Sequence, residues 1–242
     1  MIKSKYLWIS TLLLLLIIVS LNFTIMPEQK PALHYLVRHP KIQSQKPPLV
    51  ILMHGVGGNE QNMFSLANTL PDNFLVVSAR GPITLGANSF AWFQVQFTAA
   101  GSVINEAQAE SSRKEILKFI EDLKKVENFD ENQVYLMGFS QGGIMSYSVA
   151  LTEPEKIAGI AVMSGRLLPE IKPIIADKSR LKKLKFFISH GTHDSVLKKL
   201  QYALDAQEYL KSKEINPDFH QYTEDHTINP AMLNDVVNWL SK

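Results

Sequence analysis

The segment Gly138-Phe139-Ser140-Gln141-Gly142 contains the residues that point most directly to chemistry. It matches G-x-S-x-G, a motif in which a strand turns sharply into a helix and presents a serine at the turn. Glycines flank the serine because the strained backbone leaves no room for neighbouring side chains. An apolar run at 134–137 predicts a buried strand before the motif, and a helix is expected after it to about residue 151. Ser140 is therefore a candidate nucleophile.

A serine hydroxyl is a weak nucleophile, so it needs a base to take its proton and a carboxylate to orient that base. In this arrangement the partners follow in the chain order serine, acid, histidine. Asp194 follows a predicted strand at 185–188, and His226 follows one at 219–222. The carboxyl ends of parallel strands meet at one edge of a sheet. We therefore predict a triad of Ser140, Asp194 and His226.

Three further histidines follow Ser140, and none is predicted to be catalytic. His220 lies within the predicted strand at 219–222, where a structural role is expected. His190 and His193 could suggest a metal pair beside Asp194. Ligands three residues apart in a loop with no third ligand nearby are a weak metal signal, so hydrogen bonding within the loop is expected instead. The sequence predicts neither a metal nor a cofactor.

An attacked carbonyl becomes an oxyanion, which needs preorganised hydrogen-bond donors. One donor is expected from the backbone N–H of Gln141, and the other from a loop after an earlier central strand. The loop His54-Gly55-Val56-Gly57-Gly58 follows the predicted strand at 49–53, so the N–H of Val56 is the second candidate. The loop completes neither GxGxxG nor GxxxxGK[ST], which argues against a phosphate or dinucleotide site.

Strand and helix patterns alternate along the chain, which predicts an α/β fold with a mostly parallel sheet. Besides the strands already named, we expect strands at 33–37 (an edge strand), 74–77 and 157–163. Helices are expected at 61–70, 107–126, 196–210 and 230–240. A length of 242 residues fits a single domain of this class.

The N-terminus departs from this pattern. Residues 6–26 carry no charge, residues 12–19 are all Leu, Ile or Val, and Lys3 and Lys5 precede them. The stretch is long enough to cross a bilayer, and the lysines predict a cytoplasmic N-terminus. A cleaved signal peptide is the alternative, although no small-x-small cleavage site is present. We expect residues 1–27 to be a membrane anchor or signal peptide and 28–242 to be an extracytoplasmic domain.

The overall composition excludes several classes of protein. The chain has 25 basic and 23 acidic residues and a formal charge of +2, too balanced for a typical nucleic-acid binder. It contains no cysteine, so thiolate catalysis, disulfides and cysteine-ligated metals are excluded.

Six segments together resemble the phospholipase/carboxylesterase family, which includes acyl-protein thioesterases and small bacterial carboxylesterases. The resemblance spans roughly residues 48–241. It rests on the 54–58 loop, Ala91-Trp92-Phe93, Gly138 to Gly143, Ser164-Gly165-Arg166-Leu167-Leu168-Pro169, His190-Gly191-Thr192-His193-Asp194 and the segment around His226.

This resemblance implies an α/β-hydrolase fold and the same triad and oxyanion donors. It also places Trp92 and Phe93 near the acyl pocket, where ordinary core aromatics are the alternative. Two positions depart from the family pattern. Asp225 stands where a glycine is common, and Gln94 stands where an acid is frequent.

These observations predict a metal-independent serine carboxylesterase that cleaves small-molecule or lipid esters, or thioesters, through an acyl-enzyme. A lysophospholipase acting on lipids of the membrane is one alternative. A membrane-tethered binding protein that keeps the fold without the chemistry is another. The leader predicts exported ester substrates, while acyl length, leaving group and oligomeric state are left open by the sequence.

Overall fold

The computed structural model describes residues 30–98, 101–197 and 200–242. Residues 31–242 form one compact unit. The leader predicted at 1–27 lies outside the described residues. Among the residues that are described, no helix is both long and apolar enough to cross a membrane.

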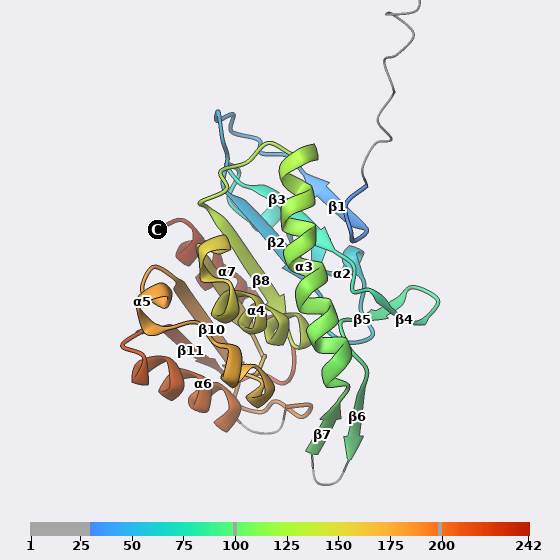
Figure 1. The fold of residues 1–242 in the computed structure, drawn as a ribbon, viewed down its shortest axis with the longest axis vertical. Helices are drawn as coiled ribbons and strands as arrows, with labels where there is room; N and C mark the ends of the chain where they lie inside the picture. Colours follow the sequence, from blue (N-terminus) through green and yellow to red (C-terminus); the bar gives the residue numbers. More distant parts are fainter. Residues whose placement is uncertain (1–29, 99–100, 198–199) are drawn as a thin grey trace, which may run out of the picture. The chain divides into compact units, whose positions relative to one another are not determined.

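A seven-stranded sheet forms the centre of this unit (Figure 1). Its order is β1-β3-β2-β8-β9-β10-β11, and every neighbouring pair is parallel except β1 with β3. The edge strand β1 is antiparallel, as an edge strand on an otherwise parallel sheet often is. The strands span Tyr35–Arg38 (β1), Leu49–Met53 (β2), Leu75–Ala79 (β3), Val134–Phe139 (β8), Gly159–Met163 (β9), Lys185–Gly191 (β10) and Asp218–Tyr222 (β11).

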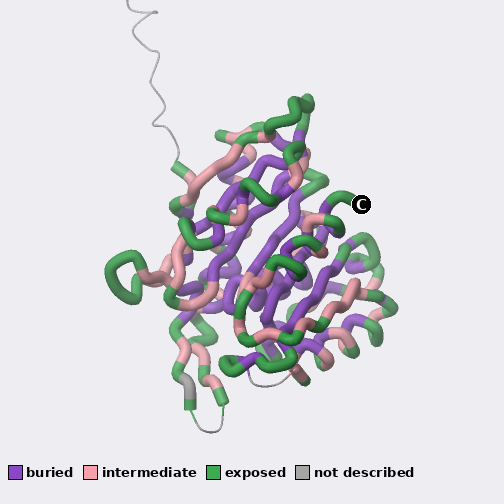
Figure 2. Tube along the Cα trace, turned by 180° about the vertical axis from the view of Figure 1, so that it is seen from behind, coloured by how far each residue is buried: buried purple, intermediate pink, exposed green. Residues whose placement is uncertain are grey.

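Helices cover both faces of the sheet, so its central strands are buried throughout (Figure 2). One face packs against α3 (Glu106–Val126), α4 (Gln141–Thr152) and α6 (Gln201–Ser212). The other packs against α2 (Glu60–Phe64) and α7 (Pro230–Leu240). The predicted α/β fold with a mostly parallel sheet is thus observed, and the continuous apolar runs of β2, β3 and β9 are buried between two layers of helices.

Two predicted helices have different bounds in the structure. The helix expected at 61–70 ends at Phe64 and is followed by a separate 3-10 turn, η1 (Ala67–Thr69). The helix expected at 196–210 begins only at Gln201. Val196 and Leu197, at its expected start, are not helical, and their backbone N–H groups donate to the carboxylate of Asp194.

Two β-hairpins between β3 and α3 were not predicted. They are β4–β5 (Ile83–Gly86 and Ser89–Ala91) and β6–β7 (Val95–Thr98 and Gly101–Ile104). The first hairpin contacts the loop at residues 54–58, which we call the glycine loop. Gly57 N–H donates to Phe90 O at 2.8 Å, and Phe90 N–H donates to Gly58 O at 2.9 Å. A 3-10 segment η3 (Pro169–Ile174) and the short helix α5 (Lys178–Leu181) were also not predicted.

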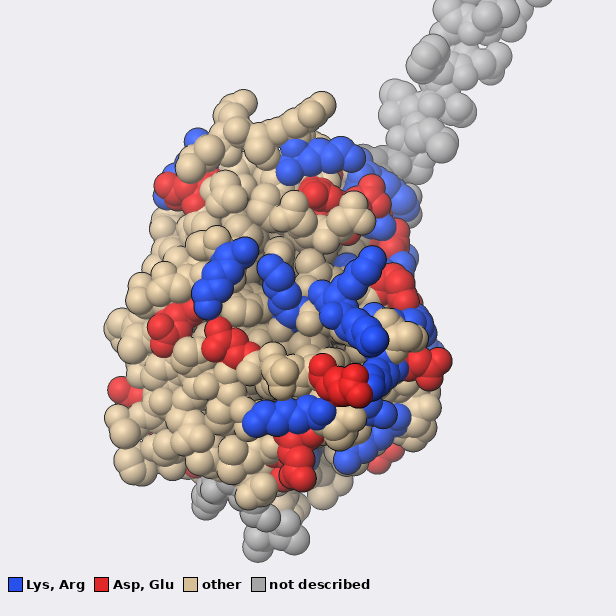
Figure 3. Space-filling view, turned by 90° about the vertical axis from the view of Figure 1, so that its left-hand side faces the viewer, with Lys and Arg blue, Asp and Glu red and all other residues tan. Residues whose placement is uncertain are grey.

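Charged side chains of both signs are interspersed on the face drawn in Figure 3. The described residues include ion pairs such as Lys156 with Glu121 and Lys124 with Glu131. This mixing agrees with the near-balance of charge in the sequence.

Candidate active site

Ser140 lies between the end of β8 and the start of α4, at the sharp turn that the motif predicts. Its φ of +52° and ψ of −114° are unusual for a residue with a side chain. Close backbone contacts make this turn dependent on its glycines. A Cβ on Gly138 would lie 2.2 Å from the carbonyl oxygen of Gly142, and a Cβ on Gly142 would lie 2.1 Å from that of Met53. The turn holds the Ser140 hydroxyl at the carboxyl edge of the sheet.

The loops after β10 and β11 bring the predicted base and acid to Ser140. The Nε2 atom of His226 lies 2.8 Å from Ser140 Oγ, and its Nδ1 atom lies 2.7 Å from Asp194 Oδ2. An ionised carboxylate only accepts hydrogen bonds, so Nδ1 carries the proton and Nε2 is left as the acceptor for the serine hydroxyl. The three residues therefore form one continuous hydrogen-bonded chain.

Asp194 is held as a buried anion. Burial acts to raise its pKa, but the hydrogen bond from His226 and the backbone N–H of Leu197 outweigh burial, so the pKa of Asp194 is lowered. Its second oxygen, Oδ1, accepts from the N–H groups of Val196 and Leu197 at 3.0 and 2.7 Å. These bonds fix the carboxylate so that Oδ2 points at His226.

The other histidines of β10, β11 and the loop after β10 do not lie between Ser140 and Asp194 in the hydrogen-bonded chain. His190 is fully buried in β10, its Nε2 lies 3.3 Å from Leu197 O and 3.5 Å from Asp194 Oδ2, and burial lowers its pKa. The backbone N–H of His193 donates to Glu224 O. His220 lies in β11, stacked on Phe187 and 2.8 Å from Asp218. The part of the chain that the structure describes contains no group of three or more potential metal ligands.

Two backbone N–H groups beside Ser140 are available to a ligand. They belong to Val56 and Gln141, and neither has an acceptor among the described residues. The loop that carries Val56 is fixed by His54, whose Nε2 accepts from Gly81 N–H at 2.9 Å and whose Nδ1 lies 2.7 Å from Gly55 O. Because Nε2 accepts the bond from Gly81 N–H, it carries no proton, so Nδ1–H donates to the Gly55 carbonyl, and burial lowers the pKa of His54.

The side chain of Gln141 has a structural role that sequence reasoning missed. Its Oε1 accepts from Trp92 N–H and its Nε2 donates to Phe93 O, both at 2.7 Å. The indole N–H of Trp92 donates to His54 O at 2.9 Å. Gln141 and Trp92 thus join the serine turn, the 91–93 segment and the glycine loop. A glutamine inside the motif was the available signal, but the position of its partners depends on tertiary structure.

A small pocket of about 30 Å³ opens beside Ser140, and we call it the catalytic pocket. Its described lining contains both candidate oxyanion residues and is otherwise mainly apolar: Val56, Phe93, Val95, Ser102, Ile104, Ser140, Gln141, Ile144, Arg166, Val196 and Leu197. Phe93 is among the residues that line it. Trp92 does not, because its fully buried indole points to the glycine loop.

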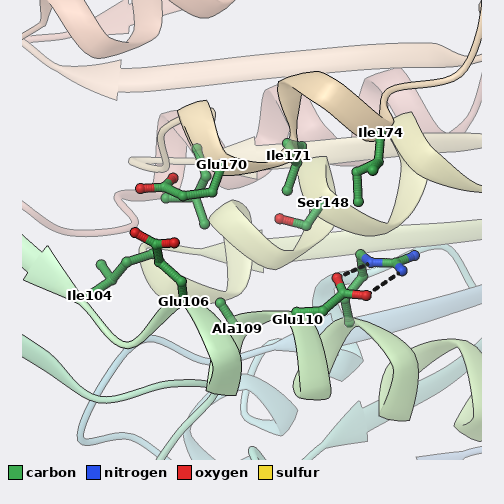
Figure 4. Close-up of a pocket in the computed structure, with 10 residues that line it drawn as sticks. Ile104, Glu106, Ala109, Glu110, Ser148, Glu170, Ile171 and Ile174 are labelled. Atoms are coloured by element: carbon green, nitrogen blue, oxygen red, sulfur yellow. Dashed lines mark hydrogen bonds and ion pairs between the residues drawn. The ribbon is translucent and has the colours of Figure 1, made fainter.

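A larger cavity of about 320 Å³ lies on the other side of Ile104, and we call it the side cavity. It lies between α3, α4 and η3, with the carboxylates of Glu106 and Glu170 at one end (Figure 4). Glu110 lies away from that end and is paired with Arg113 (Figure 4). Ile104 lines both spaces and therefore separates the catalytic pocket from the side cavity.

The two departures from the family pattern have different surroundings. The carboxylate of Asp225 accepts from Ser195 N–H at 2.6 Å, from Ser195 Oγ at 3.0 Å and from His226 N–H at 2.7 Å, and these bonds lower its pKa. It therefore ties the two loops of the hydrogen-bonded chain together. Gln94 is exposed, contacts Gln108 and does not line the described part of the catalytic pocket.

Comparison with known proteins agrees with this geometry. The model of the family described as Phospholipase/Carboxylesterase matches residues 37–242. Acyl-protein thioesterase 1 of Mycosarcoma maydis is 26% identical over 234 residues, covering 86% of this chain and 95% of that protein. Esterase YpfH of Escherichia coli is 29% identical over 185 residues, covering 74% of each.

The fold is also similar to that of a solved carboxylesterase. The crystal structure of the Bacillus cereus carboxylesterase superposes with a TM-score of 0.75 at 19% identity, covering 92% of this chain and 97% of that one. That likeness shows an α/β-hydrolase-like fold. With the family match across most of its length, the chain belongs to the phospholipase/carboxylesterase family of serine hydrolases.

Proposed function

We propose that this protein is a serine carboxylesterase that hydrolyses small carboxylic esters through an acyl-enzyme. The observation that carries the proposal is the unbroken hydrogen-bonded chain from Asp194 through His226 to Ser140, beside two N–H groups that have no acceptor in the described part of the chain. Ser140 is the proposed nucleophile, His226 the base and Asp194 the residue that orients the base.

In the first step Ser140 Oγ attacks the ester carbonyl carbon while its proton passes to His226 Nε2. The carbonyl oxygen gains the negative charge and accepts hydrogen bonds from the N–H groups of Val56 and Gln141. His226 then gives its proton to the alcohol oxygen as the carbon–oxygen bond breaks. Water, deprotonated by His226, attacks the acyl-enzyme, the serine ester breaks, and the acid and Ser140 are released.

The size of the catalytic pocket favours short acyl groups. This pocket is much smaller than the side cavity, about 30 Å³ against about 320 Å³, and Ile104 is shared by the linings of the two. This argues for short esters over the long acyl chains of a lysophospholipase. Thioesters of short acids are equally compatible with the geometry, because the attacked carbonyl is the same.

The place of action is a further part of the proposal. The uncharged stretch at residues 6–26, preceded by Lys3 and Lys5, supports a catalytic domain outside the cytoplasm, anchored by its leader or released after cleavage. Mass spectrometry of the protein recovered from its native membrane and soluble fractions tests this. An intact N-terminus in the membrane fraction indicates an anchor, a shortened chain indicates a cleaved signal, and an intact chain in the cytosol contradicts both.

The chemistry is tested by hydrolysis of 4-nitrophenyl acetate, butyrate and octanoate and of acetylthiocholine. We expect the wild type to prefer acetate or butyrate and Ser140→Ala to lose activity by roughly 10³-fold or more. The exposed Ser65 provides a matched control, and Ser65→Ala should retain wild-type rates. Equal inactivity of the folded wild type and Ser140→Ala on all four substrates contradicts the proposal and favours a tethered binding protein.

A further inference from the structure

One charged side chain, Arg166, lies in the otherwise uncharged described lining of the catalytic pocket. It follows β9 on the loop that leads to η3. The loop is closely fixed, since Ser164 N–H donates to Ser189 O at 2.9 Å and a Cβ on Gly165 would lie 2.7 Å from a methyl group of Val162. The position of Arg166 beside Ser140 is therefore built into the fold.

Neutral groups hold the guanidinium of Arg166. Its Nη2 lies 3.3 Å from Ser102 Oγ, and its Cζ lies 5.4 Å from the centre of the Tyr202 ring. A guanidinium has five N–H donors, so most of them remain available to a ligand. Its planar fork matches the two oxygens of a carboxylate.

No carboxylate within the described residues lies within 4 Å of this guanidinium. Three other arginines of the chain, Arg80, Arg113 and Arg180, each pair with a glutamate. The carboxylates of Glu106 and Glu170 line the side cavity and not the described part of the catalytic pocket. The guanidinium of Arg166 therefore keeps N–H donors and a positive charge available to an anionic ligand.

We propose that Arg166 binds a carboxylate on the substrate, so that the enzyme is selective for small esters that carry a second, anionic group. This inference rests on the proposed esterase function and adds the substrate class. Half-esters of short dicarboxylic acids carry the anion on the acyl side, and acetyl esters of hydroxy acids carry it on the alcohol side. The carboxylates of Glu106 and Glu170 disfavour an anion in the side cavity, which leaves the Arg166 side for it.

Two pairs of substrates separate these sources with the full-length protein. Ethyl hydrogen succinate and its uncharged isostere ethyl 4-methylpentanoate place the charge on the acyl group. In the second pair, 4-acetoxybenzoate and 4-isopropylphenyl acetate, the charge lies on the alcohol. The selectivity is the ratio of kcat/KM for the anionic ester to kcat/KM for its neutral isostere, so that general losses of activity cancel.

We expect Arg166→Met to lower the selectivity in at least one pair by roughly ten- to hundredfold, the range of a charge-assisted hydrogen bond. Arg166→Lys should retain part of it, because the charge remains while the fork is lost. Arg180→Met is the matched control, since it removes the same charge at a distant exposed ion pair, and it should leave both selectivities unchanged.

Three results overturn the inference. In the first, the protein hydrolyses the neutral esters, but the selectivities of Arg166→Met stay within about twofold of wild type in both pairs. This result refutes the role of Arg166 and leaves the esterase function standing. An equal loss in Arg180→Met shows a general effect of net charge. Failure of folded wild-type protein to hydrolyse any of the four esters removes the proposed function itself, and this inference with it.

Discussion

The ion pair between Glu60 and Arg80 stabilises the fold next to the 54–58 loop, which carries Val56. Its contribution to the free energy of unfolding can be measured by its pH dependence. The carboxylate of Glu60 is fully buried and accepts hydrogen bonds from the Arg80 guanidinium. Arg80 lies 4.5 Å from the centre of the Phe90 ring, and the backbone of Phe90 is hydrogen-bonded to Gly57 and Gly58. Glu60→Gln therefore removes a charge that anchors the residues around Val56.

The expected magnitude follows from the pKa. The hydrogen bond from Arg80 lowers the pKa of Glu60 from 4.5 to about 2. Such a difference between the unfolded and folded chain corresponds to about 3 kcal/mol of stability at neutral pH. Because the folded-state pKa is the lower one, this stability is fully present above pH 4.5 and is lost as the pH falls toward 2.

Urea unfolding of the wild type and Glu60→Gln at several pH values between 7 and 2.5 measures this contribution. The free energy of unfolding should differ by about 3 kcal/mol at pH 7, and the difference should shrink steadily below pH 4.5. Glu155→Gln is a matched control. Arg180 also lowers the pKa of Glu155 to about 2, but this glutamate is 56% exposed, so the loss should stay below about 1 kcal/mol. Equal losses in both variants, or a Glu60 effect independent of pH, refute the reasoning.

Three further predictions concern the catalytic pocket and its supports. Ile104→Ala should join the catalytic pocket to the side cavity and raise the ratio of kcat/KM for octanoate esters to kcat/KM for acetate esters by roughly tenfold. Ile174 lines only the side cavity, so Ile174→Ala should leave this ratio unchanged. Asp225→Ala removes three hydrogen bonds at His226 and Ser195 and should lower kcat by roughly tenfold without changing the circular dichroism spectrum; an unchanged kcat contradicts this. Gln141→Met leaves buried Trp92 N–H and Phe93 O without partners and should lower the free energy of unfolding by about 2 to 4 kcal/mol, measured in urea; a loss below about 1 kcal/mol argues against it.

The sequence was informative where one local pattern determines both structure and position. The apolar runs of β2, β8 and β9 fall where they were expected, because fully buried parallel strands are continuous in sequence. The G-x-S-x-G motif placed Ser140 on its turn, since only glycine fits at Gly138 and Gly142. Chain order and strand ends were then enough to select Asp194 and His226, which the structure brings within hydrogen-bonding distance.

The parts that were missed depend on contacts distant in sequence. The hairpin β4–β5 is largely exposed, and its register against Gly57 and Gly58 is set by bonds more than thirty residues away. The role of Asp194 Oδ1, which holds the 195–197 segment in a loop, could not be separated from a helical pattern at 196–210. The sequence did not predict that Arg166 lines the catalytic pocket, because its surroundings, which contain no acidic partner among the described residues, are set by the folded chain.

Covalent labelling of the nucleophile tests the central claim most directly. Intact-mass spectrometry after incubation with a fluorophosphonate, followed by peptide mapping, shows which residue reacts. We predict a single adduct on Ser140, absent in Ser140→Ala and formed far more slowly in Asp194→Asn, where His226 loses the acceptor that fixes its tautomer. An adduct at another residue, or none on the folded wild-type protein, contradicts the assignment of Ser140, His226 and Asp194 as a catalytic unit.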